Sequence, residues 1–180
     1  KFASIWPLSI QRSALECAIQ TDCGPIRFYS LHLTHLSAET RMPQVSSLLR
    51  LHREAQMEGA PVCGDANGGY WHDGVAKAPP PDAAILLGDF NFQPDSREYV
   101  EMVGPLSPYG GRVTHPLGFV DAWTMADGED DTGYTADVEG APARLDYAFV
   151  SASLCDRIRS CWVDRDADGS DHQPLWLDVG

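Results

Sequence analysis

The sequence predicts an α/β protein, because segments with strand patterns alternate with two helical segments. Ile26 to Leu33 is rich in aromatic and aliphatic side chains and follows Gly24-Pro25, which is typical of a strand. Ala38 to Glu58 carries apolar side chains at roughly helical spacing, and Gly59 ends this pattern. The chain has 180 residues, 43% of them hydrophobic, which is sufficient for one domain with a sizeable core.

The other predicted elements are shorter, and no linker divides the chain. The stretch before the first strand should pair with it in antiparallel fashion across a turn. Two apolar stretches late in the chain have clear strand patterns. In chain order these elements are a strand over Ala14 to Gln20, a strand over Ala84 to Leu87, a helix over Ser96 to Val103 capped by Asp95 or Ser96, an element that begins at Phe119 to Trp123, and strands over Arg144 to Ser151 and Leu175 to Val179. Residues 60–83 should form a long surface loop, and 127–131 an acidic turn.

The charge balance is strongly acidic, with 13 basic and 26 acidic residues and a net charge of −13. Proteins that bind nucleic acid non-specifically usually carry an excess of Lys and Arg. The charge therefore disfavours that function, although a bound cation can supply a local positive field. No stretch is long and apolar enough for a membrane helix, and Lys1 to Pro7 shows no signal peptide pattern. The five cysteines lack Cys-x-x-Cys spacing, which argues against a zinc site. Buried free thiols are expected, and a bridge between Cys17 and Cys23 across a turn is the alternative.

Asp89 and Asn91 directly follow the strand that begins at Ala84. Two residues at this spacing on an extended chain point to the same side. The carboxylate could then activate a water molecule while the carboxamide contacts a phosphate oxygen. An Asx turn is the alternative interpretation, because both residue types favour turns.

Ionisable side chains also accompany the later strands. Asp171 and His172 precede the final strand and offer a hard oxygen ligand beside a group that titrates near neutrality, although a solvated turn is the alternative. Asp146 lies in an apolar strand, where a carboxylate needs a partner. We expect that partner to be a His, and an Arg is the alternative.

His32 and His35 lie at the end of the strand that begins at Ile26. Two histidines three residues apart suggest a metal site, but no Cys or metalloprotease helix accompanies them. Oxygen-rich surroundings favour Mg²⁺ or Mn²⁺ over zinc. A satisfied structural histidine is the alternative for either residue.

In their order along the chain, these segments resemble the deoxyribonuclease-I-like endonuclease/exonuclease/phosphatase superfamily. The resemblance covers nearly the whole chain and implies a two-sheet β-sandwich flanked by helices. It also implies hydrolysis of phosphodiesters or phosphomonoesters by activated water with a divalent cation. The residues that carry it are His32, Gly88-Asp89-Phe90-Asn91, Arg144-Leu145-Asp146-Tyr147 and Ser170-Asp171-His172, supported by Arg41, Gln44, Pro94, Ser96 and residues 119–123.

The resemblance also implies a role for each site residue. Asp89 would activate the attacking water and act as a metal ligand, and Asn91 would contact the phosphate. Asp171 would help to hold Mg²⁺ or Mn²⁺. His172, paired with Asp146, would contact the scissile phosphate or assist the water. His32 would stabilise charge on the phosphoryl oxygens, and His35 is the second choice for that role.

One part of the family pattern has no counterpart before His32: a strand that carries an Asn and a strand that carries a metal-binding Glu. Lys1 to Leu8 instead resembles a later stretch of such proteins. We therefore expect residues 1–180 to form a single, incomplete domain that lacks its N-terminal strands. Made alone, it should be aggregation-prone or loosely folded and show little Mg²⁺-stimulated hydrolysis.

The acidity makes a small phosphorylated molecule or a lipid headgroup a better expected substrate than long nucleic acid. A non-catalytic binding module with the same fold is the alternative function, and a metal-dependent hydrolase of another ester type is a third. The sequence does not identify the compartment, although the cytoplasm is slightly favoured, and it does not indicate a protein partner.

Overall fold

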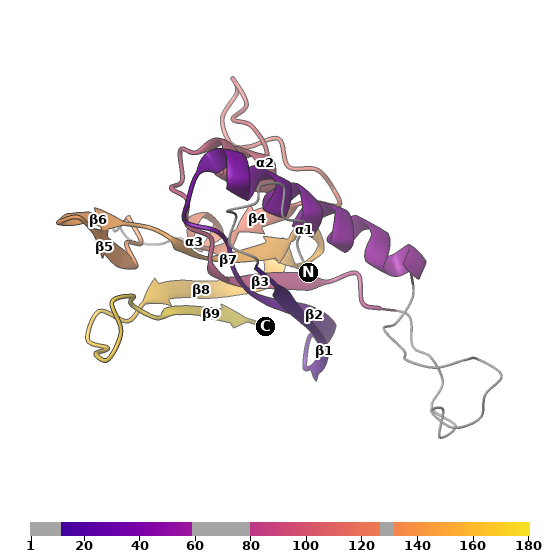
Figure 1. The fold of residues 1–180 in the computed structure, drawn as a ribbon. Helices are drawn as coiled ribbons and strands as arrows, with labels where there is room; N and C mark the ends of the chain where they lie inside the picture. Colours follow the sequence, from indigo (N-terminus) through magenta and orange to yellow (C-terminus); the bar gives the residue numbers. More distant parts are fainter. Residues whose placement is uncertain (1–11, 59–79, 127–131) are drawn as a thin grey trace, which may run out of the picture.

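The computed structural model describes residues 12–58, 80–126 and 132–180. Its centre is a five-stranded sheet with the order β1-β2-β3-β7-β4 (Figure 1). β2 runs parallel to β3, whereas β1 and β2, β3 and β7, and β4 and β7 pair in antiparallel fashion. The bounds are β1 Ala14–Thr21, β2 Gly24–His32, β3 Ala84–Asp89, β4 Phe119–Asp121 and β7 Asp146–Ser151.

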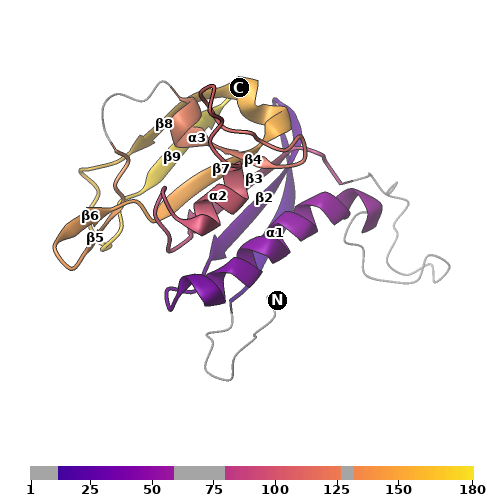
Figure 2. The ribbon, with the colours of Figure 1, turned by 90° about the horizontal axis from the view of Figure 1, so that it is seen from above.

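Two helices cover one face of this sheet. α1 (Ala38–Glu58) lies along β2, and α2 (Arg97–Val103) follows β3, as the view from above shows (Figure 2). Side chains alternate between the two faces of a strand, so Tyr29 and Leu31 of β2 pack in the same core cluster as Leu48 of α1. A buried aromatic group from the turn after β3, from α2 and from β7 fills this layer: Phe90, Phe92, Tyr99, Tyr147 and Phe149.

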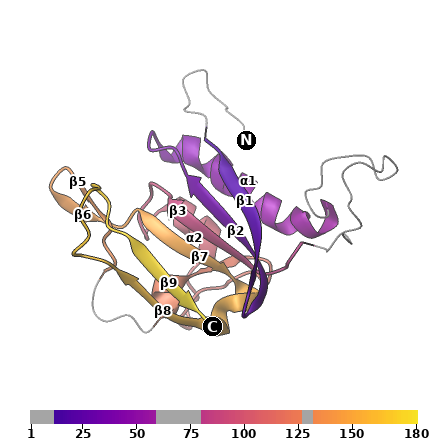
Figure 3. The same ribbon diagram turned by 90° about the horizontal axis from the view of Figure 1, so that it is seen from below.

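A second, two-stranded sheet lies against the other face. β8 (Ile158–Val163) and β9 (Leu175–Val179) pair in antiparallel fashion and lie below the β7 side of the larger sheet (Figure 3). Ile26, Ile85 and Val150 from the larger sheet form a core cluster with Cys161 of β8, against which Leu177 of β9 packs. An apolar groove of about 400 Å³ separates β9 from β2 and β3. The predicted two-layer sandwich with helices outside is therefore confirmed.

Local patterns located most elements correctly. α1, β1 and β9 lie where the sequence predicts them, and α2 begins after Ser96, whose side chain accepts a hydrogen bond from Tyr99 N as a helix cap does. The element expected over 119–123 is β4 followed by a short helix, α3 (Ala122–Met125). Four cysteines of the described residues are free, as expected. The acidic turn at 127–131 and most of the loop at 60–83 lie outside the described residues.

Three elements were not predicted from the sequence: β8, a 3₁₀ helix (η1, Ala152–Arg157) and a small hairpin. The hairpin consists of β5 (Ala136–Val138) and β6 (Ala141–Ala143). Its turn places Glu139 at φ 54° and Gly140 at φ 84°. Such turns usually contain Asn or Asp before Gly, and Glu in this position gave no recognisable signal. No helix in the described part of the chain is long and apolar enough to cross a membrane.

Candidate active site

Three of the predicted residues lie side by side because of strand register. His32 is the last residue of β2, Asp89 the last of β3 and Asp146 the first of β7. His32 is paired with Asp89 across the parallel β2–β3 ladder, and Asp89 is paired with Asp146 across the antiparallel β3–β7 ladder. One end of the central sheet therefore presents an imidazole and two carboxylates in a row.

Asp89 and Asn91 are joined by a turn rather than by an extended chain. Asn91 has a φ of 55°, and its backbone N–H donates to Asp89 Oδ1 over 2.8 Å. Its side-chain amide donates to Asp89 Oδ2 and to Leu33 O, both over 3.0 Å. The extended geometry expected here is thus wrong, and the Asx turn is the one observed. The turn nevertheless brings the carboxylate and the carboxamide into direct contact.

His32, rather than His35, contacts the carboxylate. His32 Nε2 lies 3.3 Å from Asp89 Oδ2, and the His32 side chain is 52% exposed. His35 is exposed in the loop that leads to α1. An exposed ring held at one nitrogen by a carboxylate remains accessible to a ligand. The structure therefore favours His32 over His35 as the histidine of the site.

The loop after His32 is held by α1. Gln44 Oε1 accepts a hydrogen bond from Thr34 N over 3.0 Å, and Arg41 donates to Thr34 O over 3.3 Å. Arg41 also forms an ion pair of 2.9 Å with the buried Glu98 of α2. Arg41 and Gln44, which the resemblance singled out as supporting residues, therefore fix the backbone that carries His32.

Asp146 and His172 form the second contact of the site. His172 Nδ1 lies 2.7 Å from Asp146 Oδ2, and both side chains are partly buried. The partner of Asp146 is thus a His, as expected, and not an Arg. Arg144, two residues earlier, instead forms a buried ion pair with Asp121.

Electrostatics within the cluster shift two pKa values upward. Burial raises the pKa of Asp89, and the nearby charge of Asp146 raises it further against the opposing effect of the Asn91 N–H. Burial would lower the pKa of His172, but the hydrogen bond and charge of Asp146, with smaller contributions from Asp89 and Asp171, raise it. The negative charges of Asp146, Asp89 and Asp171 therefore all favour the protonated form of His172.

Asp171 is the exposed carboxylate of the group. Residues 12–58, 80–126 and 132–180 contain no cluster of three or more His, Cys, Asp or Glu side chains that could hold a metal ion. The donors present at the site are nevertheless oxygen atoms of Asp171, Asp89 and Asn91, which suit Mg²⁺ or Mn²⁺. Mg²⁺ needs only one or two carboxylates because it retains several waters. These oxygen atoms are of the kind that such a cation binds, and water would supply the remaining ligands.

Two further buried side chains support the site: Asp121, which belongs to the recognised 119–123 segment, and Thr135, which was not predicted. Asp121 accepts hydrogen bonds from Tyr99 OH over 2.7 Å and from Arg144 over 2.6 Å, all three being buried. Thr135 is buried and contacts the backbone at Asp146. Asp121 stood within the recognised 119–123 segment, but nothing in the local sequence around Thr135 indicated this contact.

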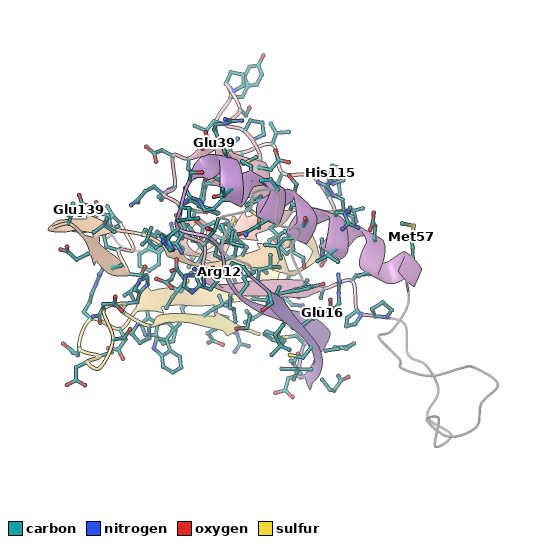
Figure 4. All side chains as sticks on the ribbon, viewed as in Figure 1. Arg12, Glu16, Glu39, Met57, His115 and Glu139 are labelled. Carbon is teal, nitrogen blue, oxygen red and sulfur yellow. The ribbon has the colours of Figure 1, made fainter. Side chains whose placement is uncertain are left out.

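Glu16, the acidic residue of β1, is far from this cluster. It is paired in register with Tyr29, well before the end of β2. Figure 4 shows Glu16 on β1, well away from Glu139, whose hairpin approaches the site through a bridge between Ala136 and His172. Glu16 therefore cannot serve as a ligand at the site.

Known proteins resemble this chain in sequence pattern and in fold. The sequence signature of the Endonuclease/Exonuclease/phosphatase family matches residues 26–172, whereas a search of curated protein sequences gives no match. Among solved structures, mannosyl-6-phosphatase Bt3783 from Bacteroides thetaiotaomicron VPI-5482 matches with a TM-score of 0.63 and 18% identity, over 97% of this chain and 59% of that chain. D. rerio TDP2, humanized by 14 mutations, matches with a TM-score of 0.60 and 19% identity, over 94% and 60%.

A third match is an endonuclease/exonuclease/phosphatase family protein from Leptotrichia buccalis C-1013-b, with a TM-score of 0.57 and 20% identity, over 93% of this chain and 52% of that chain. The chain thus spans about half to three fifths of the length of these structures. At these identities the structural matches show a shared fold. The sequence signature extends over most of the chain, and with it the chain belongs to the endonuclease/exonuclease/phosphatase family.

Proposed function

We propose that the protein carrying this sequence hydrolyses phosphate esters by attack of a water molecule activated at the end of the central sheet. The observation that carries this proposal is the meeting of two hydrogen-bonded groups there. The first is His32, Asp89 and Asn91, and the second is Asp146 and His172. A binding module without catalysis has no chemical need for both groups.

Asp89 is the residue that we assign to the attacking water. Its two carboxylate oxygens are oriented by the backbone and side-chain N–H groups of Asn91, so the carboxylate is held in one geometry. A fixed carboxylate can accept a proton from water as the water attacks phosphorus. The Asn91 amide, which also contacts Leu33 O, lies beside Asp89 and is assigned to the phosphate.

His172 and His32 are assigned to the phosphoryl oxygens. Asp146 accepts a hydrogen bond from His172 Nδ1–H, which leaves Nε2 to contact the scissile phosphate or the water. His32 is more exposed and would donate a hydrogen bond to a phosphoryl oxygen on which negative charge develops. Both imidazoles thus act where charge changes during the reaction.

Asp171, with Asp89, is the proposed ligand set for Mg²⁺ or Mn²⁺. The bound cation would stabilise the negative charge of the phosphoryl group. Asp171 suits this role because it is exposed beside His172, and the turn that carries it is fixed by a hydrogen bond from His172 N to Ser170 Oγ.

The substrate that we favour is a small phosphorylated molecule or a lipid headgroup. The net charge of −13 opposes binding of long nucleic acid. One structural relative is described as a mannosyl-6-phosphatase, which supports a small phosphomonoester, and another is TDP2. Hydrolysis of bis-p-nitrophenyl phosphate compared with that of p-nitrophenyl phosphate decides between a phosphodiester and a phosphomonoester.

The test uses the natural protein that carries this sequence, with bis-p-nitrophenyl phosphate, p-nitrophenyl phosphate and p-nitrophenyl acetate as substrates. Hydrolysis of a phosphate ester should require Mg²⁺ or Mn²⁺ and stop with EDTA. Asp89→Asn and His172→Ala should each lower kcat by at least ~10²-fold, the usual effect of losing one acid–base or electrostatic group.

Matched controls are available at distant exposed positions. Asp22→Asn changes an exposed carboxyl group in the β1–β2 turn, at the other end of β2, and His115→Ala removes an exposed imidazole. Both should retain wild-type rates. Wild-type turnover in Asp89→Asn and His172→Ala would refute the assigned roles, and tight phosphate-ester binding without turnover would support the non-catalytic alternative.

A further inference from the structure

Thr135 contacts the strand that carries Asp146, although it lies 11 residues earlier in the chain. Its side chain is completely buried. The hydroxyl oxygen accepts hydrogen bonds from two successive backbone N–H groups, those of Leu145 over 3.2 Å and Asp146 over 3.1 Å. The Thr135 N–H donates to Ala143 O over 2.9 Å. Thr135 thus fixes the backbone where β6 leads into β7.

The backbone of Thr135 holds the segment of His172 as well. Gln173 N donates to Thr135 O over 2.6 Å. Ala136, the residue that follows Thr135, forms an antiparallel bridge with His172. The segments of Asp146 and His172 are therefore attached to the same short stretch of chain. One attachment uses the hydroxyl group and the other uses the peptide group.

We infer that Thr135 is the positioning residue that sets the contact between Asp146 and His172. That contact joins His172 Nδ1 to Asp146 Oδ2 over 2.7 Å, and it depends on where both backbones lie. Loss of the Thr135 oxygen removes an acceptor from the amide of Asp146 itself, so the carboxylate is free to shift. A misplacement of about 1 Å in a catalytic geometry can reduce the rate by about 10²-fold.

If Thr135 had a purely structural role, it would only provide an acceptor for two buried N–H groups. Buried N–H groups need such acceptors throughout a protein. Ser151, at the other end of β7, provides the matched case. It is buried, and its hydroxyl oxygen accepts a hydrogen bond from Ala84 N over 3.0 Å. It differs from Thr135 in lying at the far end of the strand from Asp146. The Ser151 hydroxyl also contacts Ser153 Oγ over 3.0 Å, so Ser151→Ala measures the loss of a buried, hydrogen-bonded hydroxyl group far from Asp146.

The first readout is spectroscopic and needs neither substrate nor metal ion. In ¹H–¹⁵N spectra of the protein with labelled histidines, the Nδ1–H of His172 should be visible and slow to exchange with water in the wild type. Thr135→Ser keeps the oxygen atom and should preserve this resonance, as should Ser151→Ala. Thr135→Val keeps the shape without the oxygen, and the resonance should broaden by exchange or disappear.

The second readout is kinetic, and it rests on the proposed function. Thr135→Val should lower kcat by about 10- to 100-fold, the usual effect of removing a group that orients a site residue. KM should change little, because the groups that contact the substrate remain. Thr135→Ser should restore most of the rate, and Ser151→Ala should be close to the wild type. Urea unfolding of all four proteins records their loss of stability separately.

The outcomes separate the inference from the proposed function. If Thr135→Val retains the His172 resonance, or behaves like Ser151→Ala in both readouts, Thr135 is a structural residue and the inference is overturned. Failure of Thr135→Ser to preserve the resonance would also overturn it. If no protein hydrolyses a phosphate ester, the proposed function fails, while the spectra still decide whether Thr135 sets the contact. A wild type without a protected Nδ1–H would overturn the inference outright.

Discussion

Acidification should destabilise this protein through His52, a buried histidine of α1. His52 is 7% exposed, its ring packs against Phe119 with centroids 4.5 Å apart, and its Nδ1 lies 2.9 Å from the guanidinium of Arg27. Arg27 is itself 1% exposed and also donates to Tyr29 OH and Pro81 O. A protonated His52 would therefore place a second cation next to a buried guanidinium.

Burial, followed by the charges of Arg27 and Arg53, lowers the pKa of His52 from 6.5 to about 4. Because the folded state binds the proton more weakly than the unfolded state, His52 opposes folding as the pH falls. Its destabilising effect begins near pH 6.5, grows through the interval and is complete below about pH 4. A pKa difference of one unit corresponds to 1.36 kcal/mol, so full protonation of His52 lowers the free energy of unfolding by roughly 3 kcal/mol. Most of this loss should be present at pH 4.5.

Urea unfolding of the wild type and of His52→Gln at pH 7.5 and pH 4.5 measures this effect. Gln can accept the hydrogen bond from Arg27 but does not titrate. Other groups, among them Asp89 and His172, titrate in both proteins and cancel in the difference. The wild type should lose about 2 kcal/mol more than His52→Gln between the two pH values. His35→Gln, at an exposed position, should behave as the wild type. Equal losses in the wild type and His52→Gln would refute the reasoning.

Two further predictions concern stability, again measured by urea unfolding. Asp121→Asn breaks the buried pair with Arg144 and weakens the acceptor of Tyr99 OH, and it should lower the free energy of unfolding by about 3–5 kcal/mol. Glu54→Gln, which breaks the exposed pair with Arg50, should change it by less than about 0.5 kcal/mol; similar effects of both changes would contradict the assignment of a buried ion pair. Gly88→Ala should destabilise by about 3 kcal/mol or more, because Gly88 has a φ of 141° and a Cβ atom there would lie 1.9 Å from Leu31 O. Gly140→Ala, at φ 84° with no atom within 4 Å, should lose only about 1–2 kcal/mol, and an equal loss at both glycines would contradict the close approach of β2 and β3.

Local sequence patterns were sufficient to place most helices and strands. The bounds of α1 could be predicted because apolar spacing and the final Gly act within the segment itself. β5 and β6 could not, because their turn uses Glu at a positive φ and their residues have little strand preference. The same limit applies at Asn91. The carboxylate and the amide were recognised as a pair, but the choice between an extended chain and an Asx turn depends on contacts such as that of Asn91 with Leu33 O.

The order of the polar motifs along the chain determined the family and the candidate residues, since each motif lies at the end of a recognisable strand. Tertiary structure alone decided how these residues meet. The parallel pairing of β2 with β3 and the antiparallel pairing of β3 with β7 place His32, Asp89 and Asp146 in one row, and this register is a property of the assembled sheet. The contact between Asp146 and His172 spans 26 residues and is arranged through Thr135, which no local pattern indicates. Side-chain identity thus follows from the sequence, whereas the geometry that makes these side chains a site arises from strand register and buried hydrogen bonds between distant segments.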